Sequence, residues 1–284
     1  MIFTLKDINV CIGKEKILHN ITCSIPRGRW ISVIGTSGSG KSTLLKTLKG
    51  LVTIDSGEYF FDDRQIVRKK SIGTTFISEV GYVFQYPEHQ FFQTTVYKEL
   101  ALGLKQKKYS KKKINDTISE ILQLFDLSEE FLAKSPFQLS GGQRRKLAIA
   151  SVMTTKPKIM LLDEPTAALD PISRKKIVAG IKRWQEEGNT VIFVSHQMED
   201  VAEYSDSVIV MQRGRIVTHM DATALFLHYG NLMEESGMIL PPSVQLKDCV
   251  EKLTKEYVDI TSCREADILA AVRKVVAKRG AQFV

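Results

Sequence analysis

Long hydrophobic runs are missing from this sequence. No window approaches the ~20 apolar residues that a membrane-spanning helix needs. The first ten residues, MIFTLKDINV, also lack the basic start and the apolar stretch of a secretory signal. These two absences argue against an apolar membrane span and a cleaved leader, and we expect a cytosolic protein.

Cysteine is also scarce, and its spacing does not suggest metal binding. The four cysteines form no CxxC pair, so neither a zinc site nor a disulfide framework is predicted. We expect buried free thiols at Cys11, Cys23, Cys249 and Cys263.

The overall composition is that of a globular protein. Of the 284 residues, 43% are hydrophobic and 25% are charged, which permits a sizeable core and argues against disorder. The length suits one large unit with a tail. The formal net charge of +8 fits nucleic acid, an anionic membrane surface or anionic small ligands, and does not choose among them. We predict that the lysine-rich segment 105–113 is a solvated face.

Short apolar runs alternate with amphipathic segments. We predict strands at 30–35, 80–84, 158–163, 190–195 and 207–211. Helical periodicity marks 41–50 and 173–188, and each ends at a glycine suited to the C′ position. Several of the strands are apolar without alternation, as in a sheet covered on both faces. The pattern indicates an α/β fold with a mainly parallel sheet.

Two regions depart from this alternation. From about Thr95 to Thr155 almost every segment is helical in pattern, which predicts a helical subdomain inserted into the α/β core. After about Tyr229 the composition shifts again. We therefore expect a main domain over 1–229, containing the helical subdomain at about 95–155, and a small helical appendage over 230–284.

The segment GTSGSGKS fits the phosphate-loop pattern G-x-x-x-x-G-K-[ST] between a predicted strand and a predicted helix. Gly38 and Gly40 let the backbone curl around phosphate oxygens, and the helix N-terminus adds a favourable dipole. Lys41 supplies charge for the β- and γ-phosphates, and the Ser42 hydroxyl is a ligand for Mg²⁺. A simple glycine turn would need neither group. The predicted nucleotide contacts are Gly35, Thr36, Ser37, Gly38, Ser39, Gly40, Lys41, Ser42 and Thr43, although an ordinary first-turn role stays open for Thr43.

The segment IMLLDEP offers a second metal anchor at the end of a buried strand, where open α/β sheets bind ligands. Asp163 would hold Mg²⁺ through water, and Glu164 would orient and deprotonate the attacking water. The alternative is a solvated acidic pair. His196 follows another apolar strand, where it would contact the γ-phosphate, although a histidine at a strand end is more often structural.

The segment LSGGQRRKLAIASVM predicts a second anion site. Ser140 is a suitable N-cap for a helix with Arg144, Arg145 and Lys146 in its first turns. A helix start with flexible backbone and exposed N–H groups attracts anions. Simple capping would not need the Gly-Gly-Gln that follows Ser140.

Together these motifs resemble those of ATP-binding-cassette (ABC) ATPases. GTSGSGKS, LSGGQ, LLDEP, AALD (167–170) and SH occur in that family's order and spacing, over roughly residues 1–228. The resemblance implies an ABC-type phosphate-loop nucleotide hydrolase core and a head-to-tail dimer that sandwiches each ATP. Residues Ser140, Gly141, Gly142 and Gln143 would then serve the partner's nucleotide, and Asp170 would help join the two sites. ATP binding would close the dimer, and hydrolysis would release it.

One position departs from the family pattern. The family usually stacks an aromatic side chain from the N-terminal strand region on adenine, and Ile12 takes this place. Apolar packing replaces stacking at a modest loss, since aromatic geometry adds only ~0.5 to 1.5 kcal/mol beyond burial. ATP is still the expected nucleotide, because the chain has no N-K-x-D guanine-reading motif.

The stretch FQYPEHQFF resembles the energy-coupling-factor branch of the family, which imports vitamins and transition-metal ions. Gln85 matches the glutamine that links the γ-phosphate and metal site to the helical subdomain. The segment Tyr86–Phe92 would form an extra short helix that contacts a membrane-embedded coupling protein. The alternative is that Tyr86, Phe91 and Phe92 only pack the subdomains together.

The resemblance thus implies the ATP-hydrolysing subunit of a membrane importer, peripheral at the cytoplasmic face of the cell membrane. Expected partners are a second ABC ATPase subunit, identical or related, the coupling protein and a substrate-binding membrane subunit. The C-terminal appendage would help hold the two ATPases together, and no nucleic acid is expected. The alternatives are an ordinary ABC importer or exporter ATPase, a soluble ABC ATPase acting on ribosomes or DNA, and a nucleotide-gated clamp, which would readily lose Glu164.

Overall fold

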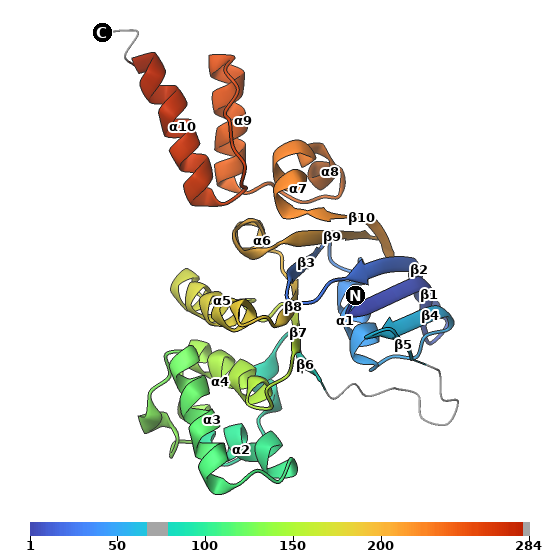
Figure 1. The fold of residues 1–284 in the computed structure, drawn as a ribbon, viewed down its shortest axis with the longest axis vertical. Helices are drawn as coiled ribbons and strands as arrows, with labels where there is room; N and C mark the ends of the chain where they lie inside the picture. Colours follow the sequence, from blue (N-terminus) through green and yellow to red (C-terminus); the bar gives the residue numbers. More distant parts are fainter. Residues whose placement is uncertain (67–78, 281–284) are drawn as a thin grey trace. The chain divides into compact units, whose positions relative to one another are not determined.

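The computed structural model describes residues 1–66 and 79–280 (Figure 1). Its internal contacts divide the chain into two compact units. The first unit comprises Met1–Arg29 and Ser42–Val194, and the second comprises Trp30–Lys41 and the chain from Ser195 onward. Both units contain strands and helices, so the α/β class expected from the sequence is confirmed.

An antiparallel sheet that the sequence did not predict begins the first unit. Its strands are β1 (Phe3–Ile12), β2 (Glu15–Ile25), β4 (Ser56–Phe61) and β5 (Arg64–Gln65), in the order β2-β1-β4-β5. The register of β1 on β2 shifts between Leu5 and Ile8 and again between Ile8 and Val10. These irregularities break the period-two alternation of buried side chains, which is the signal that sequence analysis uses for a strand.

Three parallel strands of the first unit include the one that ends at the predicted acidic pair, Asp163 and Glu164. They are β6 (Val80–Val83), β7 (Ile159–Asp163) and β8 (Thr190–Val194), and β7 pairs in parallel with both neighbours. Every residue of the three is buried, as expected for a sheet covered on both faces. The predicted strands at these places are confirmed. Helix α5 (Pro171–Glu186) begins before the predicted Ser173 because Asp170 caps it and Pro171 takes its first position.

The middle of the first unit is helical, as its pattern predicts. It contains α2 (Val96–Gln106), α3 (Lys111–Leu124) and α4 (Gly141–Met153), with two short 3₁₀ turns, η2 (Glu129–Phe131) and η3 (Pro136–Gln138). Figure 1 shows these three α-helices gathered together, with α4 in contact with the other two. The lysine-rich segment 105–113 is exposed, as predicted. The status of this stretch as a separate subdomain stays a prediction.

The second unit has its own strands and helices. Strand β3 (Trp30–Ile34) pairs in parallel with β9 (Ser207–Gln212), which pairs antiparallel with β10 (Arg215–Asp221). The described helices of this unit are α6 (Met198–Tyr204), α7 (Ala222–His228), α8 (Gly230–Glu235), α9 (Pro242–Thr254) and α10 (Glu265–Gly280). Helix α1 (Lys41–Lys49) has its first residue, Lys41, in this unit and the others in the first unit. One core joins side chains of β3, β9 and α6 to those of α9 and α10. The segment after Tyr229 is helical as expected, while the boundary at 229/230 stays a prediction.

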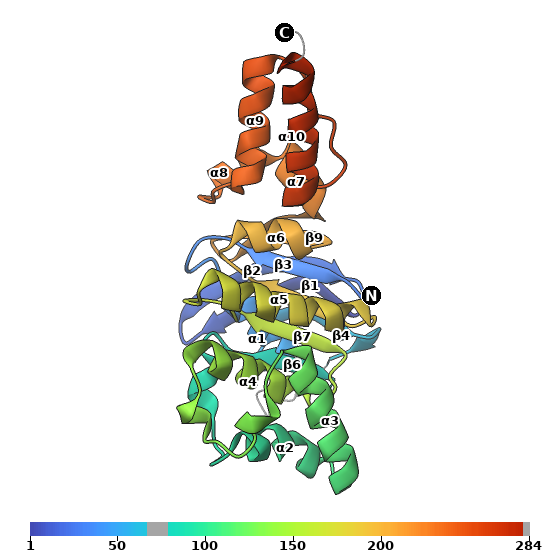
Figure 2. The same cartoon turned by 90° about the vertical axis from the view of Figure 1, so that its left-hand side faces the viewer.

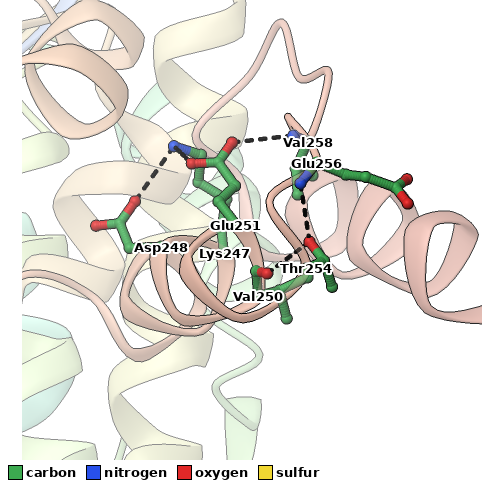
Figure 3. Close-up of polar contacts among 7 residues, drawn as sticks. All are labelled: Lys247, Asp248, Val250, Glu251, Thr254, Glu256 and Val258. Carbon is green, nitrogen blue, oxygen red and sulfur yellow. Dashed lines mark hydrogen bonds and ion pairs between the residues drawn. The ribbon is translucent and has the colours of Figure 1, made fainter.

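The C-terminal helices α9 and α10 lie side by side (Figure 2). The chain that leaves α9 is tied back to it by Glu251, whose carboxylate accepts the backbone N–H of Val258 at 2.9 Å and pairs with Lys247 at 2.9 Å (Figure 3). Burial lowers the pKa of Lys247, but hydrogen bonds and charge from Glu251 and Asp248 outweigh burial, so the pKa is raised. Lys247 is therefore protonated at ordinary pH values and keeps its ion pairs with Asp248 and Glu251.

The expectation for the cysteines is half right. Cys23 and Cys263 are buried, whereas Cys11 and Cys249 are exposed, so two of the four free thiols contradict the prediction. Cys11 lies near the end of β1, beyond the buried run of that strand, and Cys249 lies on an outward position of α9. In the described part of the chain, no helix is both long and apolar enough to cross a membrane.

Candidate functional site

The predicted phosphate loop follows β3 and ends where α1 begins. Gly35 has φ +147°, and a Cβ atom there would lie 2.1 Å from the carbonyl oxygen of Met211, so no other residue fits. The ammonium group of Lys41 is buried and donates to the carbonyls of Gly35 and Thr36 at 2.8 and 2.9 Å. The lysine is thus held by its own loop at a helix start. Residues Thr36, Ser37 and Gly38 are exposed, Gly40 and Ser42 are half-buried, and Ser39 and Thr43 are buried.

Asp163 ends β7 and is a buried carboxylate in the first unit. The hydroxyl of Ser42 donates to its Oδ1 at 3.0 Å, and the hydroxyl of Tyr82 donates to its Oδ2 at 3.1 Å. Burial raises the pKa of Asp163, and the two hydrogen bonds oppose that rise because they favour the carboxylate form. A serine hydroxyl and a carboxylate that meet are oxygen donors of the kind that Mg²⁺ prefers, so the two residues fit the predicted metal.

Sequence analysis missed Tyr82. The sequence did contain a signal for Tyr82, because it has the one side-chain hydroxyl in the apolar segment 80–84. A buried tyrosine hydroxyl needs a hydrogen-bond partner, which points to a polar group nearby. Burial and the charge of Asp163 raise the pKa of Tyr82, so its hydroxyl remains a neutral donor. Tyr82 therefore fixes the orientation of the Asp163 carboxylate.

Glu164 follows β7 with φ +49°, in the left-handed region that costs a non-glycine residue about 1 to 3 kcal/mol. Its N–H donates to the carbonyl of Val194 at 3.2 Å, and its own carbonyl accepts the N–H of Ala167 at 3.1 Å. The carboxylate accepts a hydrogen bond from Nε2 of Gln85 at 3.0 Å. The fold thus joins two predicted catalytic residues that lie 79 positions apart.

The LSGGQ segment forms the start of α4. Ser140 is its N-cap and accepts the N–H of Gln143 at 3.3 Å, while the Gln143 side chain accepts the N–H of Ser140 at 2.9 Å. This is a capping box, so the expectation that simple capping would not need the glutamine is wrong. Ser140 and Gly141 are exposed, and a Cβ atom on Gly142 would lie 2.8 Å from the hydroxyl of Ser173.

Two of the three basic residues in the first turns of this helix do not face solvent. Arg145 and Lys146 are buried. The Arg145 guanidinium donates to main-chain carbonyls, and the Lys146 ammonium donates to the carbonyl of Phe125 at 2.8 Å. A charge placed inside the protein is stable only when hydrogen bonds replace water, so these carbonyls explain the burial. Arg144 alone remains half-buried.

Asp170 caps α5 by accepting the N–H groups of Ile172 and Ser173 at 3.0 and 2.9 Å. Hydrogen bonds from the side chain and the backbone of Ser173 lower the pKa of Asp170. Because Ser173 also faces Gly142, the Asp170 loop and the start of α4 meet in the first unit. Asp170 therefore has a structural role beside its predicted one.

Two further predicted residues come from other parts of the chain. Ile12 is the last residue of β1 and is exposed, as an apolar surface for a base would be. His196 belongs to the second unit, follows Ser195 and is exposed. The hydroxyl of Ser195 accepts the N–H of Gln197 at 3.0 Å, which shapes the turn that carries His196.

The stretch after Gln85 forms a 3₁₀ helix, η1 (Pro87–Gln90), in line with the extra short helix that the resemblance implied. Tyr86 is 46% exposed and Phe92 is 79% exposed. The Phe91 ring stands edge-on to that of Phe137, with centroids 6.3 Å apart, and Phe137 is itself 65% exposed. Phe91 is thus partly packed, whereas Tyr86 and Phe92 are exposed, so internal packing does not account for these two rings. The side chains of Glu88 and His89 lie outside the described parts of the chain.

Comparisons with known proteins find relatives that span most of this chain. The family model described as ABC transporter matches residues 18–167. The energy-coupling factor transporter ATP-binding protein EcfA2 of Acetivibrio thermocellus is 40% identical over 255 residues, which are 89% of this chain and 90% of that relative.

Solved structures give the same picture. The structure of cbiO1 from Clostridium perfringens, part of the ABC transporter complex cbiONQ, matches with a TM-score of 0.73 and 29% identity over 87% of this chain and 98% of that one. The ATP-binding cassette MJ0796, in a dimeric post-hydrolysis state bound to ADP and Pi, matches with a TM-score of 0.66 and 29% identity over 78% and 98% of the two chains.

Proposed function

We propose that this chain, which belongs to the ABC transporter family and within it to the energy-coupling factor transporter ATP-binding proteins, drives the import of a vitamin or metal ion. It is an ATPase subunit and acts with partner membrane proteins, peripheral at the cytoplasmic face of the cell membrane. Identity of 40% over 89% of the chain supports this branch. An ordinary ABC importer or exporter, or a soluble ABC ATPase, is not favoured.

Nucleotide binding is assigned to the loop from Gly35 to Thr43. Its positive-φ glycines turn backbone N–H groups inward, and the start of α1 adds a favourable dipole. The ammonium of Lys41 already donates to the loop carbonyls of Gly35 and Thr36, which supports contact with the β- and γ-phosphates. Ile12 would pack on the adenine, and His196 would contact the γ-phosphate.

Hydrolysis is assigned to Glu164 and Gln85. Glu164 orients the attacking water and accepts its proton, and the amide of Gln85 holds the carboxylate in place. Oxygen atoms of Ser42, Asp163 and Gln85 would hold Mg²⁺. When bound, the metal ion neutralises charge that develops on the phosphate oxygens. The side chains of Glu164 and Gln85 position the water and each other for the reaction.

The start of α4 is assigned to the nucleotide of a second ABC ATPase subunit, identical or related. The capping box uses the N–H groups of Ser140 and Gln143, and the first four N–H groups of a helix have no partner within it. Those of Gly141 and Gly142 are therefore available to an anion. Asp170, whose loop meets Gly142 through Ser173, would connect the two sites. ATP closes this dimer because both subunits contact the γ-phosphate, and hydrolysis removes that contact.

Tyr86, Phe92 and Phe137 are exposed aromatic residues, which we group under the name aromatic patch, and Phe91, the neighbour of Phe92 in the chain, stands edge-on to Phe137. Exposed aromatic groups of this kind mark protein interaction sites. The N–H groups of Phe92 and Gln93 donate to the carboxylate of Glu99 at 3.1 and 2.9 Å, so the backbone that carries Phe92 is fixed to α2, and Tyr86 follows Gln85 directly in the chain. We assign it to the membrane coupling protein, which in turn contacts the substrate-binding membrane subunit.

The observation that carries the proposal is the pair of hydrogen bonds, Ser42 to Asp163 and Gln85 to Glu164, which joins distant segments whose residues we assign to the metal ion and to hydrolysis. The test uses the full chain reconstituted with its membrane partners in lipid vesicles. ATP-driven uptake of a radiolabelled vitamin or metal ion is expected. Vesicles that hydrolyse ATP but import none of these solutes would contradict the import function, and vesicles without ATP hydrolysis would contradict the whole proposal.

The double variant Phe92→Ala with Phe137→Ala tests the aromatic patch in the same vesicles. It should bind ATP normally and lose uptake, because it removes exposed rings outside the nucleotide site. Tyr109→Ala is the matched control, since Tyr109 is an exposed aromatic residue of the first unit between α2 and α3. Uptake at the wild-type rate in the double variant, or equal loss in Tyr109→Ala, would refute the coupling role.

A further inference from the structure

We propose that Arg145 is a positioning residue for hydrolysis, which ties the start of α4 to the two segments that carry Gln85 and Glu164. This inference rests on the function proposed above and deepens it. Arg145 lies in the first turns of the helix whose start was expected to bind an anion. In the structure its guanidinium is buried and donates to backbone carbonyls.

The guanidinium of Arg145 has three main-chain acceptors from two segments. Its Nη1 donates to the carbonyl of Gln85 at 2.7 Å and to that of Pro165 at 3.3 Å. Its Nη2 donates to the carbonyl of Ala167 at 3.3 Å. The side chain is only 3% exposed, and the Tyr86 ring lies 5.7 Å from its Cζ. Arginine suits this place because its planar fork presents several donors at fixed angles.

The acceptors are the backbone of the catalytic residues' own segments. Gln85 gives its carbonyl to Arg145 and its side-chain amide to Glu164. Pro165 follows Glu164 directly, and Ala167 donates its N–H to the carbonyl of Glu164 at 3.1 Å. Arg145 therefore holds both ends of the Gln85 to Glu164 hydrogen bond through the main chain.

Arg145 also belongs to the helix whose first residues we assign to the partner's nucleotide. Only Arg144 separates it from Gln143. A buried charge that loses its acceptors is costly, so a displacement of α4 must carry the two catalytic segments with it. Engagement of nucleotide by Ser140 and the residues after it is thereby linked to the placement of Glu164 in the same subunit.

Lys146 provides a matched contrast. It is the next residue of α4, it is buried, and it also donates to a backbone carbonyl, that of Phe125 at 2.8 Å. Phe125 follows the end of α3, away from Gln85 and the Glu164 segment in the chain. Lys146 therefore has the same physical character as Arg145 without its connection to the catalytic residues.

The test compares Arg145→Met, Arg145→Lys and Lys146→Met in the full-length chain, purified with its native partners. Steady-state ATP hydrolysis should show that Arg145→Met lowers kcat by about 10- to 100-fold, as small misplacements of catalytic groups do, while KM for ATP changes little. Arg145→Lys, which keeps the charge without the fork, should fall between this variant and wild type. Lys146→Met should lower the melting temperature and leave kcat near the wild-type value.

A double-mutant cycle with Gln85→Ala separates positioning from general stability. If Arg145 acts through Gln85, then Arg145→Met should lower kcat much less in the Gln85→Ala background. Equal losses in both backgrounds, a wild-type kcat for Arg145→Met, or the same loss in Lys146→Met would overturn the proposal. If Arg145→Met does not fold, wild-type kcat in Arg145→Lys would overturn it. Absence of ATP hydrolysis in the wild-type complex would instead contradict the proposed function.

Discussion

The carboxyl end of β7 and the amino end of α4 are built in opposite ways, although both are assigned to nucleotide. At the end of β7, Asp163 and Glu164 accept hydrogen bonds from two other segments, from Ser42 in α1 and from Tyr82 and Gln85 in and just after β6. At the start of α4, the side chains of Ser140 and Gln143 bond to each other's backbone.

The difference indicates two kinds of preorganisation. Long-range hydrogen bonds fix the acidic groups inside one unit, so their geometry depends on the folded core. The start of α4 is complete as a local structure, and its exposed residues remain free to meet another molecule. Variants that affect only one of the two regions can separate hydrolysis from dimer closure.

Glu164→Gln should have the largest effect. The amide keeps the size of the side chain and an acceptor for Gln85 but removes the general base, so kcat should fall about 10²- to 10⁴-fold while ATP affinity is retained. Single-turnover hydrolysis and equilibrium ATP binding measure the two quantities. Glu186→Gln, an exposed carboxylate at the end of α5, should retain wild-type turnover. Normal hydrolysis by Glu164→Gln would remove Glu164 as the base.

Lys41→Ala should weaken ATP binding itself. Loss of charge-assisted hydrogen bonds to phosphate, together with the bonds that brace the loop at Gly35 and Thr36, should raise the dissociation constant about 10- to 100-fold. Isothermal titration with a slowly hydrolysed ATP analogue measures it. Lys112→Ala, an exposed lysine of α3, controls for the lost charge. Unchanged affinity in Lys41→Ala would contradict the phosphate-loop assignment.

Tyr82→Phe should have a smaller effect on catalysis, through the carboxylate of Asp163 at the carboxyl end of β7. The variant keeps the ring and deletes one hydrogen bond to Asp163, so the Mg²⁺ concentration for half-maximal turnover should rise about tenfold. Tyr59→Phe is the control, because the Tyr59 hydroxyl is also buried but donates to the carbonyl of Leu48 at 2.6 Å. An unchanged Mg²⁺ requirement in Tyr82→Phe would show that its hydroxyl does not orient Asp163 for the metal.

Ser140→Ala should have the smallest effect of the four variants, and it acts at the start of α4 and not at the end of β7. Loss of an N-cap costs about 1 kcal/mol in the free energy of unfolding. Ser110→Ala removes the N-cap of α3, whose bond to the N–H of Lys113 has the same 3.3 Å length, so it should cost a similar amount. Only Ser140→Ala should reduce ATP-dependent dimer formation, measured by light scattering. A similar reduction in Ser110→Ala would assign the effect to helix stability.

Local patterns predicted many of the parts correctly. The buried parallel strands, the phosphate loop and the N-cap at Ser140 all follow from short segments of sequence. The antiparallel sheet was missed because its register shifts break the alternation on which strand prediction depends. The roles of Gly35 to Thr43, Glu164, His196 and the remaining assigned residues stay predictions until the variants are tested.

The sequence by itself determined which chemical groups are present and at which strand or helix ends they occur, because periodicity, glycines and caps are local. Only the tertiary structure decided which of those groups meet. Tyr82 reaches Asp163, and Gln85 reaches Glu164, through contacts between distant segments. The sequence placed Arg145 in the first turns of a helix, and only the structure shows that it is buried and donates to backbone carbonyls of two other segments. Side-chain placement of this kind depends on which segments the core brings together, and no local pattern encodes that.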